Sequence, residues 1–180
     1  MSAAVAELAG RIEQETVGYL LAAGARRPDV FGHVASHAGD AGFEYCYLPD
    51  FPRAAGALLG TDPERWLADL RRRARETKLR GDDHPTLNVL AMAAAYSPHP
   101  DPRSAPPGSG GFELPFEPET ARLRPAVWAR WLASDPARFA PERISAFRRL
   151  AGVWLDCGTR DEFHLHLGAR MLARRLRKLG

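Results

Sequence analysis

The sequence predicts an α/β fold with few parallel strands, in which most residues are helical and a large helical segment separates the strands. Two observations lead to this prediction. Short β-type runs lie at residues 30–35 and 151–157, and each continues into a polar loop. Nearly every other segment places apolar residues at helical spacing or is interrupted by proline.

Length and composition favour one globular domain over residues 1–180. The chain is long enough for a hydrophobic core, and its hydrophobic content is 45%. The net charge of +3 is too small to indicate a nucleic-acid-binding protein. Basic residues cluster at 71–80 and 170–178, but both runs lack interleaved aromatic residues. We expect these runs to be solvated faces of helices.

The cysteines and the N-terminal region favour a cytoplasmic protein. Cys46 and Cys157 lie far apart without metal-ligand spacing, so we expect reduced thiols. Residues 1–24 lack the features of a signal peptide, and no segment approaches the roughly 18 apolar residues of a membrane span. We expect no membrane partner, no metal and no cofactor.

The first strand is expected after a turn that ends an N-terminal helical pattern. Apolar residues recur at helical spacing over residues 3–25, and Arg27 to Asp29 ends that pattern. Residues 30–35 then have the composition of a short strand. The small polar stretch at residues 36–40 follows, which predicts a strand that continues into a loop.

Residues 41–150 are expected to form a helical cap inserted between the strands. Helix starts are indicated at Thr61–Glu64, with a capping side chain and a first-turn proline, and at Asp83 with Pro85. The stretch 97–111 is rich in Pro, Gly and Ser, and we expect a mobile loop. Further helices are expected at residues 125–133 and 141–150.

The C-terminal segment predicts the second strand followed by a helix. Residues 151–157 form the apolar run of the strand, and residues 162–179 are amphipathic. The basic last turn of this helix complements the negative end of the helix dipole.

Polar side chains follow both predicted strands. Because the carboxyl ends of parallel strands meet at one edge of a sheet, we expect them to line one crevice. A carboxylate held there can orient a histidine, which is the third role in a catalytic triad. His37 and Asp40 are candidates for binding a substrate, with hydrogen bonding within the turn as the alternative. The groups concerned are Ser36, His37 and Asp40 after the first strand and Asp156, Thr159, Arg160 and Asp161 after the second.

Two blocks of sequence resemble the esterase branch of the α/β-hydrolase superfamily, the enterochelin-esterase and esterase-D-like proteins. The blocks are RPDVFGHVASHAGDAGFEYCYLPDFP at residues 27–52 and LDCGTRDEFHLHLGARMLARRL at residues 155–176. The resemblance implies a partial α/β-hydrolase fold, a helical cap over the site, and hydrolysis of a small-molecule carboxylic ester. Asp161 matches the catalytic acid of the triad, whereas Asp156 matches a strand-end residue that hydrogen-bonds the turn.

Two parts of the family's catalytic machinery are not found in this chain. The family carries its nucleophile in G-x-S-x-G at a strained turn. The corresponding residues 13–19 lack the serine, and Thr16 is a poor substitute because it is β-branched and follows no strand. The family's catalytic histidine lies downstream of the acid, beyond Gly180. We therefore expect the C-terminal part of a hydrolase, inactive by itself, derived from an internal start, a frameshift or a repacked half-domain.

Other readings of the same residues stay open. A non-catalytic α/β-hydrolase-like binding protein is the main alternative, and nucleic-acid binding through the basic helices is a weaker one. His164 and His166 could join Asp161 in binding a metal, but no remote ligand cluster supports this, so structural roles are favoured. Residues 82–84 (Asp-Asp-His) are expected to cap a helix at the surface.

Overall fold

Two compact units make up the computed structural model of the chain. The helical unit comprises residues 49–130, and the sheet unit comprises the described residues of 21–48 and 131–179. The structure describes residues 21, 23, 24, 26–76, 79–101 and 103–179.

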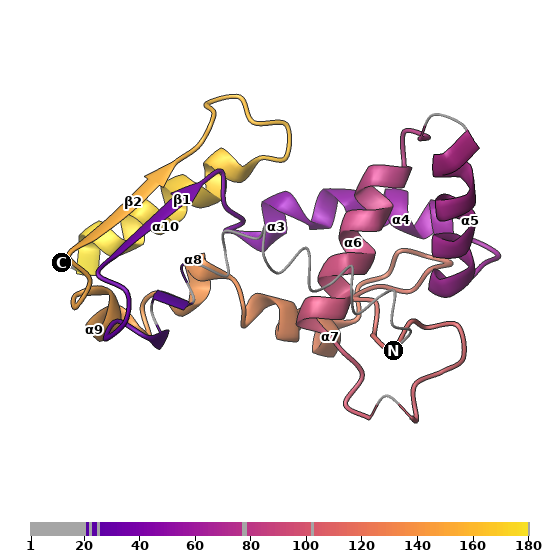
Figure 1. Ribbon diagram of the computed structural model, residues 1–180, viewed down its shortest axis with the longest axis horizontal. Helices are drawn as coiled ribbons and strands as arrows, with labels where there is room; N and C mark the ends of the chain where they lie inside the picture. Colours follow the sequence, from indigo (N-terminus) through magenta and orange to yellow (C-terminus); the bar gives the residue numbers. More distant parts are fainter. Residues whose placement is uncertain (1–20, 22, 25, 77–78, 102, 180) are drawn as a thin grey trace. The chain divides into compact units, whose positions relative to one another are not determined.

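The sheet unit is built on two parallel strands, β1 (His33–His37) and β2 (Gly152–Asp156). The register pairs His33 with Gly152 at one end and His37 with Asp156 at the other. Exposed and buried residues alternate along β1, as expected for a strand with one covered face. The helix α10 (Leu165–Leu179) runs beside the pair in Figure 1 and contacts β2. About half of the described residues are helical and the sheet has two parallel strands, which is compatible with the predicted partial α/β fold, although the predicted helical majority is not reached.

A hydrophobic core fills the space between the strands and the helices of the sheet unit. The short helices α8 (Pro136–Phe139) and α9 (Ile144–Phe147) contribute to it together with α10. Burial of each larger apolar side chain contributes roughly 1.5–3 kcal/mol. The buried members are Leu21, Val34, Phe139, Ala140, Phe147, Leu150 and Leu172, and Ile144, Val153, Leu155 and Leu176 lie against them.

A glycine allows α10 to approach the segment that precedes α3 (Phe43–Cys46). A Cβ atom added to Gly168 would lie 1.6 Å from the carbonyl oxygen of Ala41, which is far inside van der Waals contact. On the other side of this contact, Gly42 adopts φ +66°, a left-handed conformation that favours glycine. The close approach of backbone to backbone therefore depends on both glycines.

The helical unit surrounds α6 (Asp83–Tyr96), most of whose residues are buried. The helix α4 (Phe51–Leu58) contacts it, and so does α5 (Pro63–Glu76). The predicted helix starts are confirmed, and Asp62 accepts a hydrogen bond from the backbone N–H of Arg65 at 2.9 Å as a cap. The remaining helices are the 3-10 helix η1 (Leu48–Asp50) and α7 (Pro125–Leu132).

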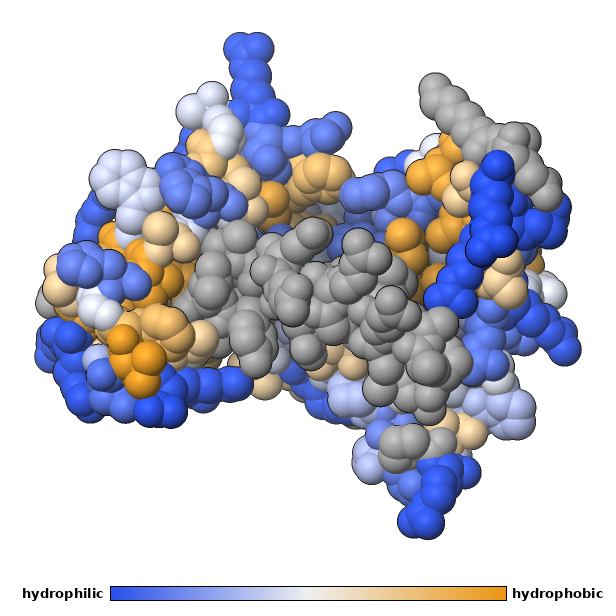
Figure 2. Space-filling model, in the orientation of Figure 1, coloured by the Kyte–Doolittle hydropathy of each residue, from blue (hydrophilic) through white to orange (hydrophobic). Residues whose placement is uncertain are grey.

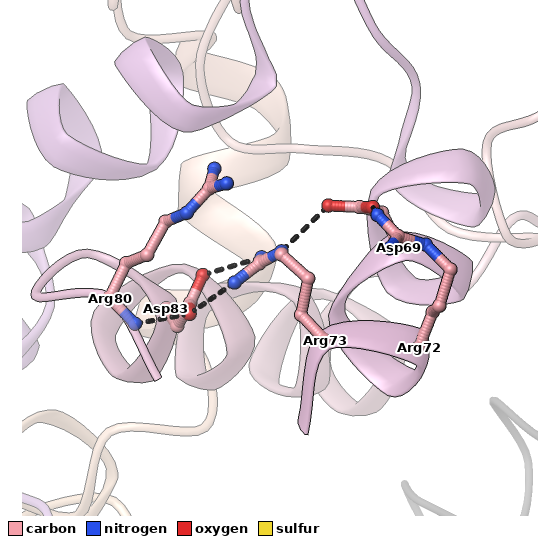
Figure 3. A network of polar contacts seen from close by, with 5 residues as sticks. All are labelled: Asp69, Arg72, Arg73, Arg80 and Asp83. Carbon is pink, nitrogen blue, oxygen red and sulfur yellow. Dashed lines mark hydrogen bonds and ion pairs between the residues drawn. The ribbon is translucent and has the colours of Figure 1, made fainter. Parts of the chain in front are cut away.

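One arginine of the basic run at 71–80 is buried rather than solvated. Arg73 is 7% exposed, and its guanidinium forms two hydrogen bonds with Asp83, at 2.8 and 2.9 Å (Figure 3). Asp83 also accepts the backbone N–H of Arg80, and Asp69 binds the Nε of Arg73. The hydrogen bonds from Arg73 hold the pKa of Asp83 below its usual value, and the backbone N–H of Arg80 lowers it further. The expectation that Asp83 lies at the surface was wrong, because its pairing with Arg73 joins α5 to α6.

The strand and helix limits differ in places from those expected. The second strand is confirmed, whereas the first begins at His33 instead of Val30 because Val30 and Phe31 donate backbone hydrogen bonds to Arg27 in a turn. The final helix begins at Leu165, and only four residues of the segment 141–150 are α-helical. The helical pattern predicted at residues 3–25 falls largely outside the described residues.

The stretch 97–111 is irregular, as predicted, but its two ends are joined. Ser97 binds Glu113 through both its backbone carbonyl and its hydroxyl, and His99 donates its backbone N–H to Gly111 at 2.9 Å. Isolated antiparallel bridges join Pro98 to Phe112 and Phe116 to Leu123. No strand longer than such a bridge occurs among the described residues of 41–150.

The surface of the sheet unit exposes hydrophobic side chains among hydrophilic ones. Figure 2 shows both kinds mingled where β2, α9 and α10 lie, and Trp154 is 64% exposed. Both cysteines are free thiols, as expected. Across the described helices, none combines the length and the apolar composition needed to traverse a bilayer.

Candidate functional site

A histidine and a carboxylate meet at the carboxyl ends of the two strands. The Nδ1 atom of His37 lies 2.9 Å from both carboxylate oxygens of Asp156. The parallel register places these two residues opposite each other, although 119 positions separate them in the sequence. Both side chains are exposed, so the pair is open to a ligand.

The surroundings of Asp156 keep its carboxylate ionised. The indole Nε1 of Trp154 donates to Oδ2 of Asp156 at 2.8 Å. This hydrogen bond and the one from His37 lower the pKa of Asp156 below its usual value. An ionised carboxylate only accepts hydrogen bonds, so Nδ1 of His37 carries the proton and Nε2 is left as an acceptor in the neutral ring. The pair therefore has the geometry of a histidine that a carboxylate orients for proton transfer.

Asp161, the predicted catalytic acid, caps α10 in this structure. Its Oδ1 accepts the backbone N–H groups of Phe163 and Leu165, at 3.0 and 3.1 Å. Its backbone carbonyl accepts the N–H of His164, which adopts φ +60°. Within the described part of the chain no hydrogen bond joins Asp161 to a histidine side chain. The carboxylate that orients an imidazole is Asp156, to which sequence reasoning gave only a role in the turn.

Asp40 lies further along the same loop but faces inward. The hydroxyl of Tyr47 donates to its Oδ2 at 2.6 Å. Burial raises the pKa of Asp40, and the charges of Asp161 and Asp135 raise it further. Of the two residues predicted to bind a substrate, His37 is therefore exposed at the strand edge, whereas Asp40 is held by Tyr47.

Asp135 is a buried carboxylate that sequence reasoning missed. It accepts three backbone N–H groups, from Gly42, Phe43 and Ala137, at 2.8 to 3.1 Å. These bonds cap α8 and hold the start of α3, while burial raises the pKa of the carboxyl. The signal was present in the sequence, since Asp before Pro136 is a frequent helix start.

The two cysteines and the histidines near the start of α10 are the candidates for a reactive thiol and for a metal site. Burial raises the pKa of both Cys46 and Cys157, so neither thiol is activated at neutral pH. The rings of His164 and His166 lie 6.3 Å apart. The described residues contain no group of three His, Cys, Asp or Glu side chains that could hold a metal ion. Thr16 and the remainder of residues 13–19 lie outside the described residues.

No protein-family model matches this chain, and no curated protein matches it either.

Proposed function

We propose that the chain carries part of the catalytic edge of a carboxylic ester hydrolase, in which His37 transfers the proton and Asp156 positions its ring. The observation that supports the proposal is the contact of His37 Nδ1 with both carboxylate oxygens of Asp156, at 2.9 Å. Ester hydrolysis as the reaction class follows from the resemblance of residues 27–52 and 155–176 to esterases.

The proposed chemistry uses the nitrogen of His37 that faces away from Asp156. A water molecule attacks the ester carbonyl, and Nε2 of His37 accepts its proton. The same nitrogen then returns the proton to the departing alkoxide, and the Asp156 carboxylate stabilises the imidazolium between the two steps. Proton transfer by a positioned histidine contributes roughly 10²–10⁴-fold to a rate.

Two carboxylates compete for the positioning role, and their substitution separates them. If Asp156 positions His37, Asp156→Asn lowers kcat by roughly two orders of magnitude or more, because the amide reverses the ring tautomer. Asp161→Asn then changes kcat little, since asparagine caps helices about as well as aspartate. The triad assignment implied by the resemblance requires the reverse order.

Hydrolysis of short p-nitrophenyl esters by the 180-residue chain tests the proposal, because attack by water requires no serine nucleophile, whereas the triad implied by the resemblance does. We expect His37→Ala to lower kcat by roughly 10²-fold or more. His33→Ala is the matched control, because His33 is also exposed on β1 but lies at the other end of the strand. Equal rates for the two variants would refute a role for His37 in proton transfer.

A non-catalytic binding protein is the second candidate. It is favoured by Ser36, the neighbour of His37 in the chain, which is only 4% exposed and lies on the covered face of β1. Reaction of the purified chain with a fluorophosphonate probe separates the candidates. Stoichiometric labelling would reject the binding protein, whereas absence of both labelling and ester turnover would reject the hydrolase.

A further inference from the structure

Two adjoining hollows form one groove along β2 and α10. One has a volume of about 410 Å³ and the other about 460 Å³, which lies within the range of small-molecule sites. Both are lined by Leu155, Ala173 and Arg177, so the two hollows lie next to each other. We call this feature the β2–α10 groove.

One half of the groove is basic. Arg170, Arg174 and Arg177 line it from α10, and their spacing places them on one side of the helix. Within the described residues none of the three forms an ion pair with a carboxylate. Asp156 also lines this half, but its oxygens are held by Trp154 and His37. Three neighbouring guanidinium groups repel one another unless an anion lies between them.

A buried nitrogen at the basic half has no hydrogen-bond partner. The ring of His166 lines this half, and its Nδ1 atom is buried without a partner among the described residues. An unsatisfied buried polar atom costs about 1–3 kcal/mol. Thr159 lines the same half, and a threonine hydroxyl can donate a hydrogen bond. The basic half thus combines positive charge with a buried polar atom that has no partner among the described residues.

The other half of the groove is mainly apolar. Residues of α9, β2 and α10 line it, and Trp154, which is 64% exposed, is one of them. Arg148 also lines this half, but its guanidinium binds the backbone carbonyl of Leu179. The apolar side chains are Ile144, Phe147, Val153, Leu155 and Leu176.

We propose that the β2–α10 groove binds an amphipathic anion, a carboxylate or phosphate monoester on an aliphatic chain. The anionic group lies among Arg170, Arg174 and Arg177, and the chain lies along Val153 and Leu176. Apolar burial and charge pairing then act on the two ends of one ligand. The proposal does not depend on ester hydrolysis, because His37 takes no part in it.

Binding of decanoate, decyl phosphate and decanol to the full chain tests the proposal. Trp154 reports binding through its fluorescence, and calorimetry gives the affinity, with each ligand kept below its micellar concentration. We expect at least one anion to bind about tenfold more tightly than decanol, which is about 1.4 kcal/mol. Inorganic phosphate, which lacks the chain, should bind more weakly than decyl phosphate. Decanoate and decyl phosphate compared directly show which head group is preferred.

Substitution of single residues locates the ligand. Arg174→Gln should lower the affinity for the two anions about tenfold and leave the affinity for decanol unchanged. Arg103→Gln is the matched control, since Arg103 is an exposed arginine of the helical unit. Ala173→Gln should lower the affinity for all three ligands, because Ala173 lines both hollows and a larger side chain there would fill space in the groove. Decanol binding as tightly as both anions, or an equal loss in Arg174→Gln and Arg103→Gln, would overturn the proposal.

Discussion

Asp156 and Asp161 show how residues five positions apart acquire different roles from their backbone surroundings. Asp156 ends β2, where its side chain reaches across to the neighbouring strand and meets His37. Asp161 lies in the following loop, where the backbone N–H groups of Phe163 and Leu165 donate to its Oδ1 at the start of α10. The sequence placed both carboxylates at the strand exit. Which one meets a histidine depends on strand register, and local sequence does not contain that information.

Asp40 provides a test of electrostatics at the level of a single residue. Its pKa is raised by burial, so the folded chain binds its proton more tightly than the unfolded chain does. Stability therefore falls as the pH rises from the unfolded pKa of about 3.9 through the higher folded pKa. Asp40→Asn should remove this fall and make the chain more stable than the wild type at pH 7.

Thermal unfolding at several values between pH 4 and pH 7 checks this expectation. Asp101→Asn is the control, because Asp101 lies exposed in the loop 97–111. Because other carboxylates titrate over the same interval, the Tm of Asp40→Asn is compared with that of the wild type. A difference that does not shift in favour of Asp40→Asn as the pH rises would contradict the assigned environment of Asp40.

Among the elements, the crossing of α10 with the segment before α3 is the most sensitive to substitution. Gly168→Ala places a methyl group against the carbonyl of Ala41, and backbone cannot move aside as a flexible side chain can. We expect the free energy of unfolding to fall by roughly 1–3 kcal/mol, the usual cost of overpacking. Urea unfolding followed by circular dichroism measures it.

Gly56→Ala is the matched substitution in another helix. Gly56 lies exposed in α4, and a Cβ atom there meets nothing within 4 Å. Alanine should therefore raise stability slightly, by up to about 1 kcal/mol, because it is the better helix former. If Gly168→Ala were as stable as Gly56→Ala, the close approach of α10 to Ala41 would be wrong.

The elements that sequence predicted best are those whose limits are set by local chemistry. Pro63 with a capping Asp62 defines the start of α5, and the apolar run after Gly152 defines β2. The start of β1 was misplaced because the apolar residues Val30 and Phe31 suggested strand, although they are exposed in a turn. The buried role of Arg73 was also missed, since its partner lies on a different helix.

For the whole molecule, the distribution of buried residues predicts uneven stability. In the helical unit, residues 89–94 of α6 are all buried. In the sheet unit, β1 and β2 each pair on one side only within the described residues, and a two-stranded sheet alone is marginally stable. Amides of α6 should therefore exchange with deuterium more slowly than those of β1 and β2.

Hydrogen exchange read by mass spectrometry compares the two segments in one sample. Saturating decanoate provides a further comparison, since a ligand beside β2 should slow exchange there and leave α6 unaffected. Exchange in β1 and β2 that is as slow as in α6 without ligand would show that other contacts stabilise the strands.

The joined ends of the stretch 97–111 have a practical consequence for labelling the protein. Hydrogen bonds from Ser97 and His99 to the far side of the loop fix the distance that the intervening chain must span. Lengthening a loop whose ends are fixed costs only about 0.6 kcal/mol for each doubling. A short epitope or a fluorophore site inserted near Ser104 would thus lie on the helical unit, leaving the strand edge and the β2–α10 groove with their native sequence.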